Sequence, residues 1–523
     1  MSVIQPNAHG DWWRHGVFYQ IYPRSYQDTN GDGVGDLNGI LSRLDHLTDL
    51  GIDAVWLSPF YRSPMDDFGY DVSDYTDVDP AFGTLADFDR LLAEAHARGI
   101  RIIVDLVPNH TSSQHPWFVE ARTTKESPKR DWYIWADPKP DGSLPNNWRS
   151  VFKRAGAAWT LDRGTGQYYL HSFLSSQPDL NWWNVGVRDA IDDVMRFWLE
   201  RGVDGFRVDV AHGMIHDREL RDEPRVRLVG PARRRMQFDR PEVLDVHRRF
   251  RKTLDSYDDR MAVAEIGYRA DPRYVAGYSG EDLLHLSFNF AFLRQAWRAE
   301  AFRRVTEQAE RFLPRGAWPN YTLSNHDVPR AISRYGDAQA RVAALTLLTM
   351  RGTPFIYYGE EIGMHDLEIP KRRRLDVADR DRARTPMQWD GTPTAGFTTG
   401  EPWLPVGTDR RTANVARERS HSRSMLSLYR QLLALRRRSP ALHAGTYRTV
   451  RAPDGVWAYV RESAGERWLV ALNFRSRVRR VDLSRVSREG VLAVSTGLDR
   501  ERGVLDLREL KLEADEGLLV RIR

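Results

Sequence analysis

The sequence predicts an α/β fold, a (β/α)8 TIM barrel with an excursion subdomain after strand three and a C-terminal antiparallel β domain. Three observations predict it. Eight short apolar runs lie between residues 17 and 358, with helical segments between them. The interval between the third and fourth runs is too long for one crossover helix. Beyond residue 444 the pattern changes to alternating segments that are typical of antiparallel strands.

The eight expected strands are short and largely apolar. In chain order they are Val17–Tyr22, Ala54–Pro59, Arg101–Val107, Gly205–Val210, Met261–Ile266, Leu283–Phe288, Tyr321–Ser324 and Thr353–Tyr358. Expected helices at Leu37–Leu50, Leu85–Arg98 and Val187–Arg201 precede the second, third and fourth strands, and a glycine follows each helix. Because eight such units follow one another, the pattern favours a closed barrel over an open doubly wound sheet.

Changes in composition predict the domain limits. Residues 1–107 and 179–444 form the two parts of the barrel, and the last barrel helix is expected near Ser424–Arg438. Residues 108–178 are rich in Pro, Gly, Trp and Asn and form the excursion subdomain, subdomain B. Residues 445–523 form a small β-sandwich domain, with strands expected at Val456–Glu462, Arg467–Phe474 and Leu518–Arg523.

Composition excludes several classes of protein. With 523 residues, 41% of them hydrophobic, and a mean hydropathy of −0.56, the chain is expected to be soluble and globular. We find no membrane-spanning run and no signal peptide. There is no Cys, which excludes disulfides and favours the cytoplasm. A net charge of +5 is weak at this length, so we expect neither nucleic acid nor membrane as a partner. The sequence does not set the oligomeric state.

Acidic residues follow three of the expected strands. They are Asp209 in GFRVD, Glu265 in AEIGY and Asp327 in SNHD. The carboxyl ends of barrel strands meet at one face, so we expect these side chains to lie together. Two carboxyl groups, one an acid and the other a base or nucleophile, are the minimum for breaking a glycosidic bond.

Neighbouring residues predict different states for two of these groups. Arg207 and Asp209 are two apart on a strand and point the same way. The guanidinium is expected to lower the pKa of Asp209, which suits a nucleophile. Glu265 ends an apolar strand, where desolvation favours a protonated carboxyl and therefore a general acid. The alternative interpretation is a structural ion pair and an idle surface Glu.

The order and wording of these motifs resemble the α-amylase superfamily of glycoside hydrolases (family 13), in its α-glucosidase and oligo-1,6-glucosidase branch. Further segments carry the likeness in order: MDDFGYDVSDY (Met65–Tyr75), DLVPNH (Asp105–His110), QPDLNWW (Gln177–Trp183), GTPFIYYGEEIGM (Gly352–Met364) and ARTPMQWD (Ala383–Asp390). The likeness spans about Asp11 to Pro440. One departure is Ala264, where the family usually has Gly.

The resemblance implies sugar contacts beside the bond that is cut. Asp327 holds the hydroxyls next to the anomeric carbon, and His326 donates to the same sugar. His110 supplies a second imidazole, while Asp105 orients its loop and Arg207 lies beside the nucleophile.

The resemblance also implies how the other end of the pocket closes. Tyr70 lies flat against the apolar face of a glucose ring. Asp67 accepts hydrogen bonds from the hydroxyls farthest from the cut bond, with Arg384 beside it. Such a charged pair turns a groove into a pocket, which implies an exo-acting enzyme. A Gly-Tyr turn with a surface Arg is the bland alternative.

The function implied is a retaining α-glucosidase that hydrolyses short oligosaccharides. The alternative is an α-glucosyl transferase or isomerase, such as a trehalose synthase, on the same scaffold. A non-catalytic relative is disfavoured because all three carboxylates are present. Val210, after the nucleophile, goes with α-1,6 bonds in the family, but Ala211, His212 and Gly213 depart from that branch. Both linkages therefore stay open.

An acidic loop, DTNGDGVGD, predicts a structural cation. Its oxygen donors stand at alternate positions: Asp28, Asn30, Asp32, the carbonyl of Val34, and Asp36. Such hard ligands suit Ca²⁺ or Mg²⁺. Gly39 replaces the bidentate Glu of an EF-hand, so the loop is not one. A set of Asx-turns without metal is the alternative. We expect no organic cofactor.

Overall fold

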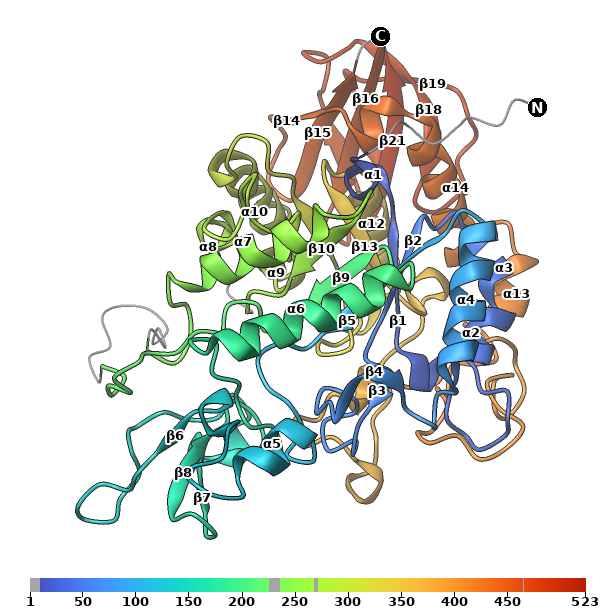
Figure 1. Ribbon diagram of the computed structural model, residues 1–523. Coiled ribbons are helices and arrows are strands. Elements are labelled where there is room, and N and C mark those ends of the chain that lie inside the picture. Colours follow the sequence, from blue (N-terminus) through green and yellow to red (C-terminus); the bar gives the residue numbers. More distant parts are fainter. Residues whose placement is uncertain (1–9, 225–235, 268–270, 464) are drawn as a thin grey trace.

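The computed structural model describes residues 10–224, 236–267, 271–463 and 465–523. The N-terminal nine residues and Tyr268 of AEIGY therefore lie outside the described part. Eight parallel strands form the central sheet (Figure 1). They are β1 (Phe18–Ile21), β2 (Ala54–Leu57), β5 (Arg101–Leu106), β9 (Gly205–Val208), β10 (Met261–Ala264), β11 (Leu286–Ser287), β12 (Asn320–Thr322) and β13 (Thr353–Tyr357).

The strand order confirms the barrel. Neighbours run β11-β10-β9-β5-β2-β1-β13-β12, so β1 pairs with β13, and consecutive barrel strands pair everywhere except between β11 and β12. Between β11 and β12 the side chain of Asn320 bridges the gap. Its Nδ2 donates to the Ser287 carbonyl at 2.9 Å, and its Oδ1 accepts from the Asn289 N–H at 3.3 Å. The strand expected at Leu283–Phe288 is shorter, because only Leu286–Ser287 pairs.

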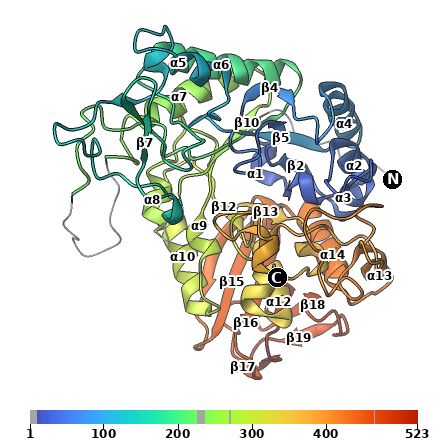
Figure 2. The ribbon, with the colours of Figure 1, turned by 90° about the horizontal axis from the view of Figure 1, so that it is seen from below.

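Helices surround these strands, as Figure 2 shows for α4, α6 and α10. The barrel helices are α1 (Trp12–His15), α2 (Leu37–Ser42), α3 (Leu44–Leu50), α4 (Leu85–Ala97), α6 (Val185–Glu200), α7 (Val243–Leu254), α8 (Pro272–Ala276), α9 (Phe290–Leu293), α10 (Ala299–Phe312), α11 (Ala331–Tyr335), α12 (Asp337–Thr349), α13 (Val415–Arg419), α14 (Met425–Arg438) and α15 (Pro440–His443). The helical stretch expected at Leu37–Leu50 is present as two helices, α2 and α3. It breaks at Arg43, where the preceding Ser42 hydroxyl bonds the Gly39 carbonyl and competes with the helix.

The excursion after β5 forms its own small sheet. It contains α5 (Pro116–Ala121) and β6 (Trp135–Ala136), β7 (Trp159–Asp162) and β8 (Gln167–Leu170), paired antiparallel in the order β6-β8-β7. A hairpin of β3 (Tyr61–Arg62) and β4 (Asp74–Val78) follows β2. Both lie at the bottom of Figure 1, below the carboxyl ends of the barrel strands.

The C-terminal strands lie at the opposite end of the barrel (Figure 1). One sheet has the order β14-β15-β16-β21-β18-β19 and a second pairs β17 with β20. These strands are β14 (Thr446–Val450), β15 (Val456–Ser463), β16 (Glu466–Asn473), β17 (Arg479–Val481), β18 (Glu489–Ser495), β19 (Val504–Asp506), β20 (Leu510–Leu512) and β21 (Gly517–Ile522). The large sheet buries Val520 and its neighbours against the small one, while Trp457 and Tyr459 join the barrel's core.

The domain limits stay predictions, although β14 begins close to the expected boundary. No helix within the described ranges is long and apolar enough to cross a membrane.

Candidate active site

The three predicted carboxylates lie at the carboxyl end of the barrel. Asp209 and Glu265 directly follow β9 and β10, and Asp327 follows β12 after a short loop. Arg207, inside β9, brings two of them together. Its Nη1 lies 2.6 Å from Asp209 Oδ1 and 2.5 Å from Asp105 Oδ1, and its Nη2 lies 2.7 Å from Glu265 Oε2. One buried guanidinium therefore joins three carboxyl groups.

The expected ionisation of Asp209 needs a correction. Burial raises the pKa of Asp209 well above its usual range, and Arg207 lowers it only in part. The neighbouring carboxyl groups of Glu265 and Asp105 raise the pKa of Asp209 further. We had expected the guanidinium to dominate, but desolvation at 5% exposure is the larger effect.

The turn after Asp209 carries backbone strain. Val210 has a φ of 44°, in the left-handed region that β-branched residues rarely adopt. A conformation of this kind costs on the order of 1–3 kcal/mol and is typical of functional sites. The Val210 N–H donates to Glu265 Oε2 at 3.2 Å. The strained turn therefore contacts the predicted acid.

Asp327 is held as a carboxylate by two arginines. Arg380 Nη1 and Arg384 Nη2 lie 3.2 and 3.1 Å from its Oδ1. Burial opposes the charge, but His326 and the two arginines outweigh burial and lower the pKa of Asp327 well below its usual range. Burial also lowers the pKa of His326 to about 3, so that imidazole is neutral. We therefore attribute the state of Asp327 to the arginines.

The arginine beside Asp67 is Arg380, and the expectation of Arg384 there was wrong. Arg380 Nη2 lies 2.5 Å from Asp67 Oδ1, whereas Arg384 donates to Asp327 and to the His326 carbonyl. Arg380 also pairs with Asp376 at 2.6 Å. It reaches both predicted ends of the pocket because Asp67 and Asp327 lie on either side of it.

Tyr70 and His110 lie near these carboxylates. The Tyr70 hydroxyl lies 2.7 Å from His326 Nε2 and 3.4 Å from Asp105 Oδ2. Its ring stacks on His326 with centroids 5.4 Å apart. Burial lowers the pKa of His110 to about 4. His110 is therefore neutral, and its Nε2 lies 3.1 Å from the Tyr70 carbonyl. Neutral imidazoles suit hydrogen bonding to sugar hydroxyls.

Sequence reasoning missed three contributors, of which Trp56 and Gln20 are buried and Arg380 is partly buried. Arg380 precedes the ARTPMQWD segment, and no spacing distinguishes it from its basic neighbours. Trp56 donates to Asp105 Oδ2 at 2.8 Å, and Gln20 Nε2 lies 2.7 Å from His326 Nδ1. Both are on barrel strands and point inward. That position was the available signal, because inward polar side chains on a barrel strand need a partner.

The acidic loop is held by its own amides. Asp28 Oδ1 accepts from the N–H groups of Asn30 and Gly31 at 2.9 and 2.8 Å, and Asp36 Oδ2 accepts from the Thr29 N–H at 2.8 Å. Asp32 Oδ1 accepts from the Val34 N–H at 2.8 Å. In the described part of the chain no three acidic or histidine side chains form a metal cluster. This arrangement matches Asx-turns, and the cation stays a prediction.

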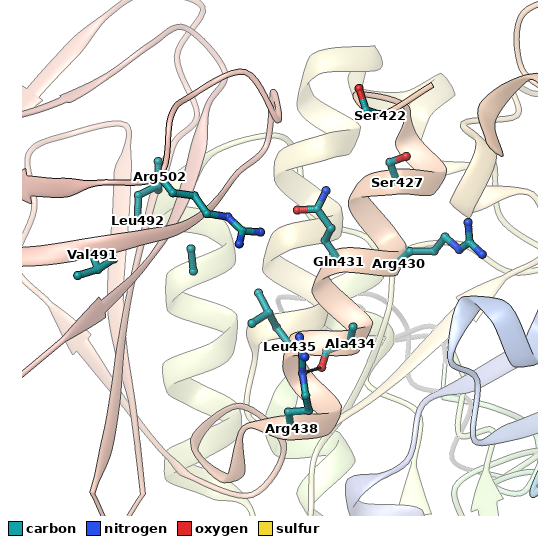
Figure 3. Close-up of a pocket in the computed structure, with 11 residues that line it drawn as sticks. Ser422, Ser427, Arg430, Gln431, Ala434, Leu435, Arg438, Val491, Leu492 and Arg502 are labelled. Carbon is teal, nitrogen blue, oxygen red and sulfur yellow. Dashed lines mark hydrogen bonds between the residues drawn. The ribbon is translucent and has the colours of Figure 1, made fainter. Parts of the chain in front are cut away.

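A separate groove of about 620 Å³ lies between α14 and β18 (Figure 3). Arg502 and Gln431 point into it, and Leu435 forms part of its wall. Among the described residues, no carboxylate or aromatic side chain lines this groove. It therefore offers neither an acid and nucleophile nor a face for a sugar ring, and the chemistry belongs to the barrel.

Comparisons with known proteins agree with this geometry. The family described as "Alpha amylase, catalytic domain" matches residues 20–445. A probable alpha-glucosidase of Rhizobium meliloti (strain 1021) is 44% identical over 503 residues, covering 90% of each chain. An oligo-1,6-glucosidase of Parageobacillus thermoglucosidasius is 37% identical, covering 98% of this chain and 99% of the relative.

Solved structures show the same likeness. An alpha-glucosyl transfer enzyme superposes with a TM-score of 0.92 at 40% identity, covering 98% of this chain and 99% of the other. The trehalulose synthase of Pseudomonas mesoacidophila MX-45 gives 0.91 at 34% identity, covering 99% and 100%. With a matching family model over most of its length and the carboxylates assembled at the barrel's carboxyl end, the chain belongs to the alpha-amylase family of glycoside hydrolases (family 13).

Proposed function

We propose that this enzyme is a retaining, exo-acting α-glucosidase that hydrolyses short α-glucosides from the non-reducing end. The observation that carries the proposal is the contact of Arg207 with Asp209 and Glu265. One guanidinium contacts both carboxyl groups, at 2.6 and 2.7 Å, which favours a close pair over the gap of about 6.5–9.5 Å that an inverting enzyme needs for its water. Relatives named alpha-glucosidase and oligo-1,6-glucosidase support the substrate class.

In the proposed mechanism each carboxyl group acts twice. Asp209 attacks the anomeric carbon as a carboxylate, and Glu265 gives its proton to the departing oxygen. The bond from sugar to leaving group breaks as the bond to Asp209 forms. Glu265 then takes a proton from water, whose oxygen displaces Asp209 and restores both groups. Two inversions give net retention.

The remaining residues act on the sugar and on the charge. Asp327, kept ionised by Arg380 and Arg384, accepts hydrogen bonds from the sugar hydroxyls next to the anomeric carbon. Asp67 and Arg380 close the far end, so the pocket admits only a chain end. Arg207 stabilises negative charge on the pair as the proton leaves Glu265.

The anomer formed first tests this proposal. Proton NMR during hydrolysis should show α-glucose before mutarotation, whereas β-glucose first contradicts it. Separate initial rates on maltose, isomaltose, trehalose and sucrose will define the linkage. Structural likeness to an alpha-glucosyl transfer enzyme and to a trehalulose synthase supports sugar transfer as a second activity. Product analysis at high sugar concentration will separate transfer from hydrolysis.

The acidic loop Asp28–Asp36 is the place where we propose that Ca²⁺ or Mg²⁺ binds, supported by its five oxygen donors. An ion that binds only the folded protein stabilises it in proportion to occupancy. A chelator should therefore lower the melting temperature by a few degrees and leave room-temperature turnover nearly unchanged. Asp32→Asn should abolish that shift, and an unchanged melting temperature in the parent contradicts the site. The cytoplasmic compartment stays a prediction.

A further inference from the structure

The residue after the nucleophile is held in an unfavourable turn by its surroundings. Val210 has a φ of 44° and is 7% exposed. Its carbonyl accepts from the Gly213 N–H at 2.8 Å, and a Cβ added to Gly213 comes within 2.6 Å of Val210 Cγ1. The Ala211 N–H donates to the Glu265 carbonyl at 2.8 Å. Neighbouring groups thus fix the left-handed turn although the side chain disfavours it.

This turn determines which oxygen of Glu265 is occupied. The Val210 N–H donates to Oε2 at 3.2 Å, and Arg207 Nη2 lies 2.7 Å from the same oxygen. An oxygen that accepts from two donors is the unprotonated oxygen of a carboxyl group. When Glu265 is protonated, its proton therefore resides on Oε1.

We propose that Val210 is a positioning residue for the acid. Its left-handed turn directs the N–H to Oε2 and thereby leaves Oε1 to carry the proton that goes to the leaving group. Without this N–H, Oε2 keeps the contact with Arg207 but loses its second donor, so the carboxyl group is held less firmly. The inference rests on the proposed function, in which Glu265 is the acid.

Two substrates with different leaving groups separate acid positioning from general damage. Fluoride leaves an α-glucosyl fluoride with little help from an acid, whereas the sugar oxygen of maltose needs a proton to leave. The parameter kcat/KM reports the steps up to bond cleavage. A defect confined to the acid raises the fluoride-to-maltose ratio of kcat/KM, and a merely structural defect lowers both values alike.

Substitutions at Val210 provide the test and its matched control. Val210→Pro removes the N–H and fixes φ near −65°. We expect a loss of about 100-fold on maltose, within the range of general-acid effects, and less than about tenfold on the fluoride. Val210→Gly keeps the N–H and adopts the turn without strain, so its ratio should stay within about threefold of the parent. Equal losses in Val210→Pro, or a raised ratio in Val210→Gly, overturn the inference.

A second variant covers the case in which Val210→Pro does not fold. Gly213→Ala presses a methyl group against Val210 Cγ1 and displaces the turn without removing any N–H. Its ratio should rise by about three- to tenfold, in the same direction. In the double variant Val210→Gly/Gly213→Ala the clash with Cγ1 is absent while the contact with the Phe238 ring remains, so the ratio should return part of the way to the parent value. A folded Gly213→Ala protein with an unchanged ratio overturns the inference.

Glu265→Gln separates the role of Glu265 as the acid from the role of Val210 in positioning it. It should raise the ratio more than any Val210 variant, because it removes the acid itself. If Glu265→Gln leaves the ratio unchanged, the acid assignment within the proposed function fails. If Glu265→Gln raises it and Val210→Pro does not, only the positioning role fails.

Discussion

Buried arginines at the two ends of the barrel have opposite kinds of partner. At the carboxyl end Arg207 contacts Asp105, Asp209 and Glu265. At the other end Arg461 donates to four backbone carbonyls, those of Thr349, Gly445, Thr446 and Leu442. Burial opposes both charges. Carboxylates nevertheless raise the pKa of Arg207 well above its usual range, whereas burial lowers the pKa of Arg461 to about 9.

The two kinds of partner give the two arginines different roles. Carbonyls offer dipoles that orient a guanidinium, so Arg461 joins the end of α12 to the first C-terminal strands as a scaffold. Arg436, buried nearby, bonds the carbonyls of Leu348, Met350, Gly352 and Leu442 in the same way. Carboxylates exchange protons and negative charge, so the Arg207 cluster is the chemically active one.

The largest effect should come from the carboxylates of the active cluster. Asp209→Asn and Glu265→Gln should each lower turnover of maltose by roughly 10³-fold or more, equivalent to about 4 kcal/mol, because double displacement needs both groups. Steady-state kinetics and circular dichroism will separate chemistry from folding. The exposed Asp193→Asn is the control. Azide should partly rescue Asp209→Ala and give a glucosyl azide of inverted configuration. Near-normal activity in either single variant contradicts the roles.

Substitution of Arg461 should lower the stability of the fold and leave catalysis unchanged. Arg461→Met leaves four carbonyls without their donor, and we expect the free energy of unfolding to fall by about 3 kcal/mol. Turnover of the folded fraction should stay close to the parent value. Urea unfolding checks the first expectation and active-site titration the second. The exposed Arg448→Met is the matched control. If Arg461→Met lowers turnover while the protein is still folded, the surroundings of Arg461 and the Arg207 site are not independent.

His247 is a buried base whose partner, like those of Arg461, is a backbone carbonyl. Burial lowers the pKa of His247 to about 4, and its Nε2 lies 2.7 Å from the Ala211 carbonyl. The unfolded imidazole titrates near 6.5, so this residue's contribution is present above pH 6.5 and is lost as the pH falls toward 4. His247→Gln should reduce the fall in the free energy of unfolding between pH 6.5 and pH 4 by about 3 kcal/mol. Urea unfolding at several pH values measures it, with exposed His421→Gln as the control. If the free energy of unfolding depends on pH in the same way in His247→Gln and in the parent, His247 is not a neutral, buried residue.

The smallest expected effect concerns linkage. A β-branched side chain after the nucleophile narrows the space for the leaving sugar, and a 1,6 bond bends around it more easily. Val210→Thr should raise the maltose-to-isomaltose ratio of kcat/KM by about tenfold. Thr replaces one methyl group of Val with a hydroxyl group and keeps the N–H, so the contact with Glu265 Oε2 should not change. An unchanged linkage ratio means that the loop from Ala211 to Gly213 sets the preference.

Much of this molecule could be predicted from the sequence, because apolar runs and glycine stops are local signals. The eight strands, and the site face where Asp209, Glu265 and Asp327 meet, follow from them. Arg380 could not be chosen over Arg384, because which one reaches Asp67 depends on the path of a long loop. The raised pKa of Asp209 depends on desolvation by the surrounding layers, and the turn at Val210 is imposed by tertiary contacts. Neither feature can be read from the residues that neighbour it in the sequence.

The central claim is that Asp209 forms a covalent bond to the sugar. A 5-fluoro-α-glucosyl fluoride slows the second displacement more than the first, so the glycosyl-enzyme accumulates. After proteolysis, mass spectrometry should find one fluoroglucosyl group on the peptide that contains Asp209, attached to its carboxylate. A label on Glu265, or continued turnover with no labelled peptide, contradicts the account.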